Sequence, residues 1–382
     1  MIDLFDSLKS LLQEETVRID NLVFRLHSRA TVLILSTCAI LVTAKQYIGE
    51  PISCITDKTI EYRPLSFPKL STDRDPINAY CWIYSTFTVS RHLTGTPGIG
   101  VASPGVGQAL DNDEIHHHRY YQWVCFVLAL QALMFYTPRA LWGVWERGTV
   151  KLLSANLGTP FFRDVWSKER KDQLVEYFTT TNLHTHNFYA FRFLTCEILN
   201  FCNAIGQIYF LDVFLEGQFS KYGPAVTAFA IETNPFQRID PMARLFPKVT
   251  KCTIHTFGSS GSPQTHDALC ILPLNVVNEK IFVFIWFWLV FLAIVSGLAV
   301  IYRIIVFSQP WARVYLLRAT VQFISRSKAE TVVQSFGIGD WFLLHQLSHN
   351  LNPIIFWELV NELAMKFSSK YSEEKSRRMD FI

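Results

Sequence analysis

Charged residues are scarce in this chain. Only 18% of its 382 residues are Asp, Glu, Lys or Arg, whereas an ordinary soluble domain has about 25%. Half of the residues are hydrophobic, and the mean hydropathy is +0.19. This composition excludes a soluble enzyme of this length, and the 31 Phe and 10 Trp exclude a disordered chain. The net charge of only +3 argues against a nucleic-acid-binding protein. We therefore expect a polytopic membrane protein.

Long hydrophobic runs are few and well separated, and a helix that crosses a bilayer needs about 20 apolar residues. The uncharged run from Ala30 to Ala44 is short, and it reaches that length only if Lys45 snorkels or faces water. The second run opens on aromatic residues suited to a headgroup interface, and it should kink near Pro138. We predict four transmembrane helices, at residues 30–48, 120–138, 191–212 and 281–303.

The third run is the least apolar, and its polar residues follow a pattern. At 100° per residue, four of them fall within roughly 80° on a helical wheel, and a glutamate lies slightly to one side. Such a stripe should face other helices or a water-filled cavity rather than lipid. We favour hydrogen bonding between helices over pore lining. The stripe comprises Arg192, Glu197, Asn200, Asn203 and Gln207.

Four spans place both termini on the same side of the membrane. Lys and Arg are more frequent in the terminal segments and the middle loop than in the other two loops, which favours cytoplasmic termini. We predict extracellular loops at residues 49–119 and 213–280. The predicted cytoplasmic parts are an N-terminal helix at 1–29, a loop at 139–190, and a helical C-terminal domain and tail at 304–382.

No cysteine lies in a segment assigned to the cytoplasm. Four of the eight cysteines lie in the apolar runs, and the other four are divided equally between the two predicted extracellular loops. An even number confined to one side of the membrane is typical of disulfides in an oxidising compartment. Four cysteines allow three pairings, between which their spacing does not decide. They are Cys54 and Cys81 in the first loop, and Cys252 and Cys270 in the second.

Catalytic, cofactor and glycosylation signatures are missing. The consecutive histidines 116–118 diverge on any regular backbone, and the pair His345 and His349 lacks the glutamate of a zinc-protease motif. We therefore predict no enzyme activity, no metal and no cofactor. No asparagine in the predicted extracellular loops is followed by the x-Ser/Thr of a glycan acceptor. Without bulky glycans, these loops could contact another protein closely.

The N-terminal segment has helical periodicity. Its apolar residues are Leu4, Phe5, Leu8, Leu11 and Leu12, with polar residues between them. This pattern predicts a short amphipathic helix. Composition alone favours a position on the membrane surface.

Three longer motifs resemble those of a known protein family. Residues 46–54 read QYIGEPISC, after the first predicted span, and residues 338–344 read IGDWFLL, followed by Asn352 and Pro353. At these positions and at the start of the second span, the chain resembles the innexins, the invertebrate gap-junction family. The residues that match the family signature at that span are Tyr120, Tyr121, Gln122, Trp123, Val124 and, downstream, Pro138.

The resemblance implies an all-α polytopic membrane protein, the four-transmembrane-helix subunit of a large-pore channel, with disulfide-stapled extracellular loops and a helical cytoplasmic domain. It implies the disulfide pairs Cys54 with Cys270 and Cys81 with Cys252. It also moves the N-terminal helix from the membrane surface into the cytoplasmic funnel of the pore. Lys45 and Glu50 become candidates for pore-lining residues that select charge.

The same resemblance implies partners and a location. The subunits form a homo-oligomeric ring of eight or hetero-oligomers with other innexins, and a ring docks with one on the adjacent cell. The channel lies in the plasma membrane at gap junctions, and unpaired rings act as hemichannels. Two alternatives remain open at this point. One is a non-docking release channel of the pannexin type, and the other is a membrane enzyme that uses the histidines.

Overall fold

The structure is a computed structural model of the chain, and it groups the residues into two units. The terminal unit contains both chain ends and comprises residues 1–33, 133–203 and 292–382; the sheet unit comprises 34–132 and 204–291. The described residues are 17–56, 76–93, 101, 103–110, 112–155, 157, 166–181, 183–232, 240–321 and 324–379. The amphipathic pattern predicted between Leu4 and Leu12 therefore lies outside the described residues.

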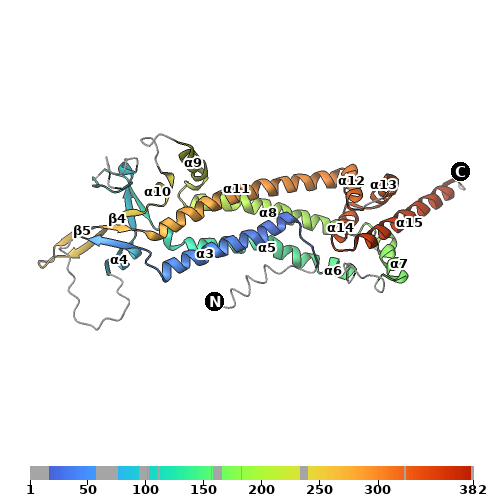
Figure 1. The fold of residues 1–382 in the computed structure, drawn as a ribbon, viewed down its shortest axis with the longest axis horizontal. Coiled ribbons are helices and arrows are strands. Elements are labelled where there is room, and N and C mark those ends of the chain that lie inside the picture. Colours follow the sequence, from blue (N-terminus) through green and yellow to red (C-terminus); the bar gives the residue numbers. More distant parts are fainter. Residues whose placement is uncertain are drawn as a thin grey trace, which may run out of the picture. The chain divides into compact units, whose positions relative to one another are not determined.

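Long helices connect the two units. The first is continuous from Leu22 to Tyr47 and combines α2 (Leu22–Arg25), the π-helical turn η1 (Leu26–Thr31) and α3 (Val32–Tyr47). The others are α5 (Val124–Glu146), α8 (Asn187–Phe214) and α11 (Pro273–Ser308), all seen in Figure 1. Each begins in one unit and ends in the other. The chain thus passes between the units only through long helices in its described part.

Three helices of the described residues are long and apolar enough to cross a membrane: Leu22–Tyr47, α5 and α11. A fourth candidate consists of α8 together with α9 (Phe219–Ile231), which are bent by 87° relative to each other. All four helices extend beyond the apolar runs predicted as spans, because backbone hydrogen bonding does not stop where side chains become polar. Helix α5 continues through Pro138 to Glu146.

The sheet unit contains a five-stranded antiparallel sheet with the order β1-β5-β4-β2-β3. The chain is mostly helical as predicted, but the prediction of an all-α fold is wrong for this part. Strand β4 alternates buried and less buried residues from Val249 to Ile254, and that period of two is the mark of a half-buried strand. The strands are β1 (Ser53–Thr56), β2 (Thr86–Val89), β3 (Ile115–His118), β4 (Val249–Phe257) and β5 (Pro263–Ile271).

The two predicted extracellular loops form this sheet together. The second loop supplies the β4–β5 hairpin, in which Val249 pairs with Ile271 and Phe257 with Pro263. The first loop supplies β1 on one side of the hairpin and β2 with β3 on the other. Short helices complete the unit: α4 (Pro76–Tyr84), η2 (Ser90–His92), η3 (Tyr120–Gln122), α9 and α10 (Pro241–Leu245).

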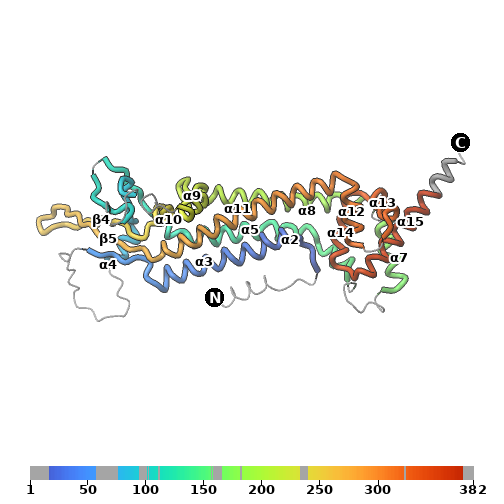
Figure 2. The backbone as a smooth tube through the Cα atoms, turned by 45° about the horizontal axis from the view of Figure 1, so that its top comes forward, coloured from blue at the N-terminus to red at the C-terminus, as the bar shows by residue number. Residues whose placement is uncertain are grey.

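The terminal unit is held by an aromatic core. Phe193 of α8 packs against Trp142 and Phe342, with ring centroids 4.9 Å apart in each case, and against Phe24 at 5.2 Å. Figure 2 shows the last four helices of the chain gathered in this unit. Its further elements are α6 (Thr149–Leu153), α7 (Lys168–Glu176), η4 (Tyr177–Thr181), α12 (Pro310–Thr320), α13 (Arg326–Ser335), α14 (Ile338–Ser348) and α15 (Pro353–Met379).

Candidate functional site

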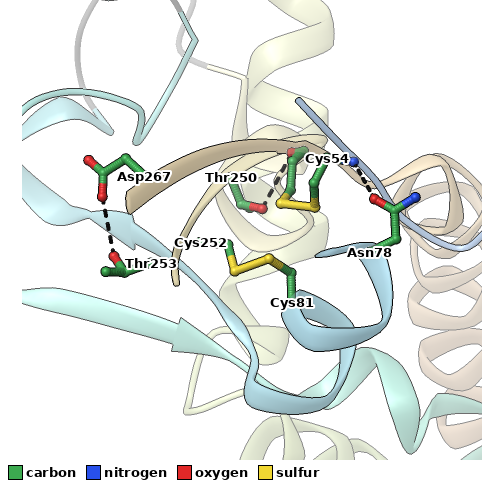
Figure 3. The surroundings of a disulfide bond; sticks show 8 residues. Cys54, Asn78, Cys81, Thr250, Cys252, Thr253 and Asp267 are labelled. Carbon is green, nitrogen blue, oxygen red and sulfur yellow. Dashed lines mark hydrogen bonds between the residues drawn. A yellow bond between two sulfur atoms is a disulfide. The ribbon is translucent and has the colours of Figure 1, made fainter. Parts of the chain in front are cut away.

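Two disulfides join the predicted extracellular loops. Cys54 of β1 is bonded to Cys270, its direct neighbour in the β1–β5 register, and Cys81 of α4 is bonded to Cys252 of β4. These are the pairs that the family resemblance implies. The Sγ atoms of Cys54, Cys81 and Cys270 lie within 4.8 Å of one another. Figure 3 shows the two bonds beside Asn78, whose Oδ1 accepts a hydrogen bond from the Cys54 N–H at 2.7 Å.

A cavity of about 440 Å³ lies beside these disulfides in the sheet unit. It collects residues from three separate segments: the end of α3 with the turn after it, helix α4, and the end of η3 with the start of α5. Two of the three motifs that carry the family resemblance, at residues 46–54 and 120–124, therefore meet here. The lining residues are Gln46, Tyr47, Glu50, Pro51, Ile52, Asn78, Ala79, Trp82, Ile83, Gln122, Trp123 and Phe126.

The cavity has apolar walls and few polar groups. Gln122 donates a hydrogen bond from Nε2 to the Trp82 carbonyl, which ties η3 to α4. Gln46 is only 7% exposed, and its Oε1 has no hydrogen-bond partner among the described residues. Glu50 is exposed and lines the cavity, whereas the half-buried Lys45 does not. The two predicted pore-lining residues therefore have different surroundings.

The remaining residues of the signature at 120–124 serve packing. Tyr121 is fully buried and contacts the Trp82 ring at a centroid distance of 4.6 Å. The Tyr120 hydroxyl donates a hydrogen bond to the Leu245 carbonyl at 3.2 Å, and Val124 is buried. Only Gln122 and Trp123 of this motif line the cavity.

Asn203, one residue of the polar stripe, makes a hydrogen bond next to Pro138. Because proline has no N–H, it cannot bond the carbonyl four residues earlier in the helix, which is that of Met134. The side-chain Nδ2 of Asn203 in α8 donates to that carbonyl at 3.4 Å. A polar group from a neighbouring helix thus replaces the hydrogen bond that proline removes, as expected for a helix that crosses a membrane.

Glu197 is the centre of a buried polar cluster in the terminal unit. Its carboxylate accepts two hydrogen bonds from Arg303 of α11, at 2.8 and 2.9 Å, and a third from the Asn21 side chain at 2.6 Å. Asn21 also caps α2, since its Oδ1 accepts from the Phe24 N–H at 2.8 Å. The Arg303 guanidinium lies over the Phe193 ring at 5.0 Å. Three helices are joined at one carboxylate, so the full pairing offsets the cost of burying the charges.

The other stripe residues make weaker contacts. Gln207 accepts a hydrogen bond from Gln131 of α5 at 3.0 Å. The Arg192 guanidinium lies 4.2 Å from the centroid of the Phe188 ring. Asn200 is buried, and its Nδ2 has no partner among the described residues. The stripe therefore connects α8 to α5, α11 and the residue before α2.

The motif at 338–344 joins α14 to the start of α8. Asp340 is 1% exposed and accepts hydrogen bonds from the His184 N–H at 2.8 Å, the Gly337 N–H at 3.2 Å and the His186 ring at 2.7 Å. Burial by itself would raise the pKa of Asp340, but these hydrogen bonds hold the pKa below its usual value. A Cβ on Gly339 would lie 2.1 Å from the His186 carbonyl, so only glycine fits there.

The histidines singled out in the sequence serve the packing of both units. On β3, His118 lies 2.9 Å from the Thr88 hydroxyl, and burial, with a smaller contribution from His116 and His117, lowers the pKa of His118 to about 4. In α14, the His345 ring stacks on Trp341 at 5.2 Å and meets the His349 ring edge-on at 5.0 Å.

Comparison with known proteins extends the resemblance over the whole chain. A family model described as Innexin matches residues 20–367. Innexin inx2 of Drosophila melanogaster is 51% identical over 381 residues, which cover 100% of both chains. The chain belongs to the innexin family. Innexin inx2 of Schistocerca americana is 50% identical over 97% of this innexin and 99% of its own length, and innexin shaking-B of Drosophila melanogaster is 41% identical over 95% and 94%.

Helix α4 lines the cavity but was not predicted from the sequence. Residues 49–119 of this innexin were expected to form a loop, yet Trp82 and Ile83 form one wall of the cavity. A signal was present: Pro76 stands at the first helical position, and the apolar Ile77, Tyr80, Cys81 and Tyr84 follow at helical spacing. The nine-residue length and the surrounding polar loop concealed it.

Proposed function

We infer that this innexin is the subunit of a gap-junction channel, an oligomer that passes ions and small solutes between adjacent cells at the plasma membrane. The observation that carries this conclusion is the match to innexins over the entire chain. Innexins are channel proteins, so permeation by diffusion through a wet pore requires no catalytic residue.

We propose that the chain crosses the membrane four times, with both termini in the cytoplasm. The chain passes four times from one unit to the other, and each time it does so through a long helix. This pattern supports four membrane crossings. Both ends and the middle loop, which are richer in Lys and Arg, belong to the terminal unit. The disulfide-bonded loops belong to the sheet unit, as expected on the oxidising side.

We propose further that eight subunits form a ring and that two rings dock across the intercellular gap. Two disulfides hold the sheet that would face the opposite ring. The lack of glycan acceptors in these loops would leave that surface open to contact. Other innexins are candidate partners within the same ring, and an unpaired ring would act as a hemichannel.

Lys45 and Glu50 are the proposed charge-selecting residues of the pore. Lys45 lies in the last turn of the first long helix and Glu50 lies just after that helix, and both belong to the sheet unit. Exchanging their signs with Lys45→Glu and Glu50→Lys should shift the ratio of anion to cation permeability in opposite directions. The measurement is the reversal potential of single rings in asymmetric salt. An unchanged ratio in both variants would remove these residues from the pore.

The direct test is junctional coupling between paired cells that express only this chain. We expect electrical current and transfer of a small dye, and purified particles should appear as rings of eight in electron micrographs. Current in single cells without transfer between pairs would instead favour the non-docking, pannexin-type channel. Pairs that pass neither current nor dye would contradict homotypic gap-junction function.

A further inference from the structure

The cavity in the sheet unit contains a hydrogen-bond acceptor without a donor. Gln46 is 7% exposed and lines the cavity, and its Oε1 makes no hydrogen bond to any described residue. A buried acceptor that is left unpaired destabilises the protein, because it has lost its hydrogen bonds to water without gaining others. A donor that enters the cavity with a ligand would therefore bind there favourably.

A negative charge lines the same cavity. Glu50 forms no ion pair with another residue of the described part of the chain, and the lining set contains no Lys, Arg or His. The Glu50 carboxylate and the Gln46 Oε1 are both acceptors. The negative charge disfavours an anionic head group, and the two acceptors favour a cation that carries N–H donors.

The walls define the rest of the ligand. Trp82 and Trp123 contribute aromatic surface to the walls, and an aromatic ring attracts a cation that lies close to it. Trp123 and Phe126 are 60% and 58% exposed in the single chain, so an apolar tail that covers them would remove apolar surface from water. At about 440 Å³, the cavity has the size of an ordinary small-molecule site.

We propose that this cavity binds the primary ammonium group of an amphipathic molecule. The ammonium lies between the Glu50 carboxylate and the Gln46 Oε1, and the apolar part covers Trp123 and Phe126. Two sources share this chemistry: a membrane lipid with an ethanolamine head group, and a free lipophilic amine. The proposal rests on the geometry of one subunit and does not depend on docking or on the route of the pore.

Calorimetric titration of the full chain, purified as its assembled particle in detergent, tests the proposal. The probe is 4-phenylbutylammonium, compared with its N,N,N-trimethyl derivative and with 4-phenylbutanol. The trimethyl compound keeps the charge but has no N–H donor, so it should bind at least about tenfold more weakly, because it cannot make the charge-assisted hydrogen bonds. The alcohol lacks the charge and should bind more weakly still. Equal affinity for all three compounds, or no binding of any, would overturn the proposal.

Variants then locate the site. Glu50→Gln and Gln46→Leu should each weaken binding of the probe by about tenfold, and Ala79→Trp should abolish it by filling the cavity without changing any charge. The matched control is Glu114→Gln, an exposed glutamate of the sheet unit that does not line the cavity. Each variant is compared only if it elutes as the wild-type particle, and Ala79→Trp keeps the test decisive if the charge variants do not assemble. Wild-type affinity in every assembled cavity variant would contradict the assignment.

Lipid composition distinguishes the two sources. The titration is repeated in nanodiscs of phosphatidylcholine alone and with added phosphatidylethanolamine. A rise in the apparent Kd of the probe with phosphatidylethanolamine identifies the lipid head group as the occupant. An unchanged Kd, with the variant effects retained, identifies a free amine. Both results support the ammonium site.

Discussion

The two units of this innexin are stabilised in different ways. In the sheet unit, two disulfides and a β-sheet join segments that are 216 and 171 residues apart in sequence. In the terminal unit, the cysteines Cys196 and Cys202 are free, and the described helices are held by an aromatic core and by buried polar contacts. The difference shows that cross-links can join loops that lie far apart in sequence, and that packing and polar contacts join the helices of the terminal unit without such links.

The largest predicted effect comes from removing one disulfide of the sheet unit. Replacing Cys54 and Cys270 together by Ser should destabilise the protein by about 4 kcal/mol, because this bond closes a further loop in the unfolded chain even when the Cys81–Cys252 bond is intact. Thermal unfolding in detergent and dye coupling between paired cells measure the loss. Cys202→Ser is the control, since Cys202 is free and exposed. Wild-type coupling in the double variant would show that the sheet is held without its cross-link.

The second prediction concerns the buried ion pair between Arg303 and Glu197 in the terminal unit. Arg303→Met leaves the Glu197 carboxylate buried without its main partner, and should cost about 3 kcal/mol or more. The double variant Arg303→Met with Glu197→Leu removes both charges and should recover most of this loss. Melting temperatures of the three proteins check the pattern. If the double variant is as unstable as the single one, the pair is not the origin of the effect.

The third prediction concerns Asp340, with a smaller effect that depends on pH. Asp340→Asn should cost about 2 kcal/mol at pH 7, because the carboxylate accepts charge-assisted hydrogen bonds from α8 and its approach. The pKa of Asp340 is lowered in the folded state, so its contribution is complete above the unfolded value of about 3.9. It is lost only as the pH falls through the lowered folded value.

Melting temperatures of Asp340→Asn and wild type at pH 7, 5 and 3.5 test this sign. The difference between the two proteins should be the same at pH 7 and 5, and should begin to shrink only at the lowest pH. A difference that disappears between pH 7 and 5 would contradict the lowered pKa of Asp340, because the carboxylate would then take up its proton in that range.

The smallest predicted effect concerns Asn203, one residue of the polar stripe. Asn203→Leu should cost about 1 kcal/mol, since Asn203 donates to the Met134 carbonyl, to which Pro138 has no N–H to donate. In a Pro138→Ala background the helix itself bonds that carbonyl, and the same substitution should cost nearly nothing. A double-mutant cycle of melting temperatures measures the coupling. An equal cost in both backgrounds would separate Asn203 from the proline.

Local patterns predicted much of this molecule. The apolar run at 281–303 lies in α11, and the run at 120–138 lies in α5 from Val124 onward, with η3 before it, since an apolar run of that length is typical of a membrane-spanning helix. The stripe in 191–212 lies on one helix because its spacing is helical. The division of four cysteines between two loops indicated disulfides, although spacing could not choose the partners.

Contacts between distant segments could not be predicted in this way. Nothing near Gln46 indicates that α4 and η3 close a cavity over it, and nothing near Glu197 names Arg303 or Asn21 as partners. Strands β1, β2 and β3 have four residues each, too few for a clear alternation, and the pairing of the longer β4 and β5 with them joins segments far apart in sequence. Composition and periodicity thus determined that the chain crosses a membrane through helices. Only the tertiary structure decided which residues meet, because periodicity describes one element, whereas packing joins elements hundreds of residues apart.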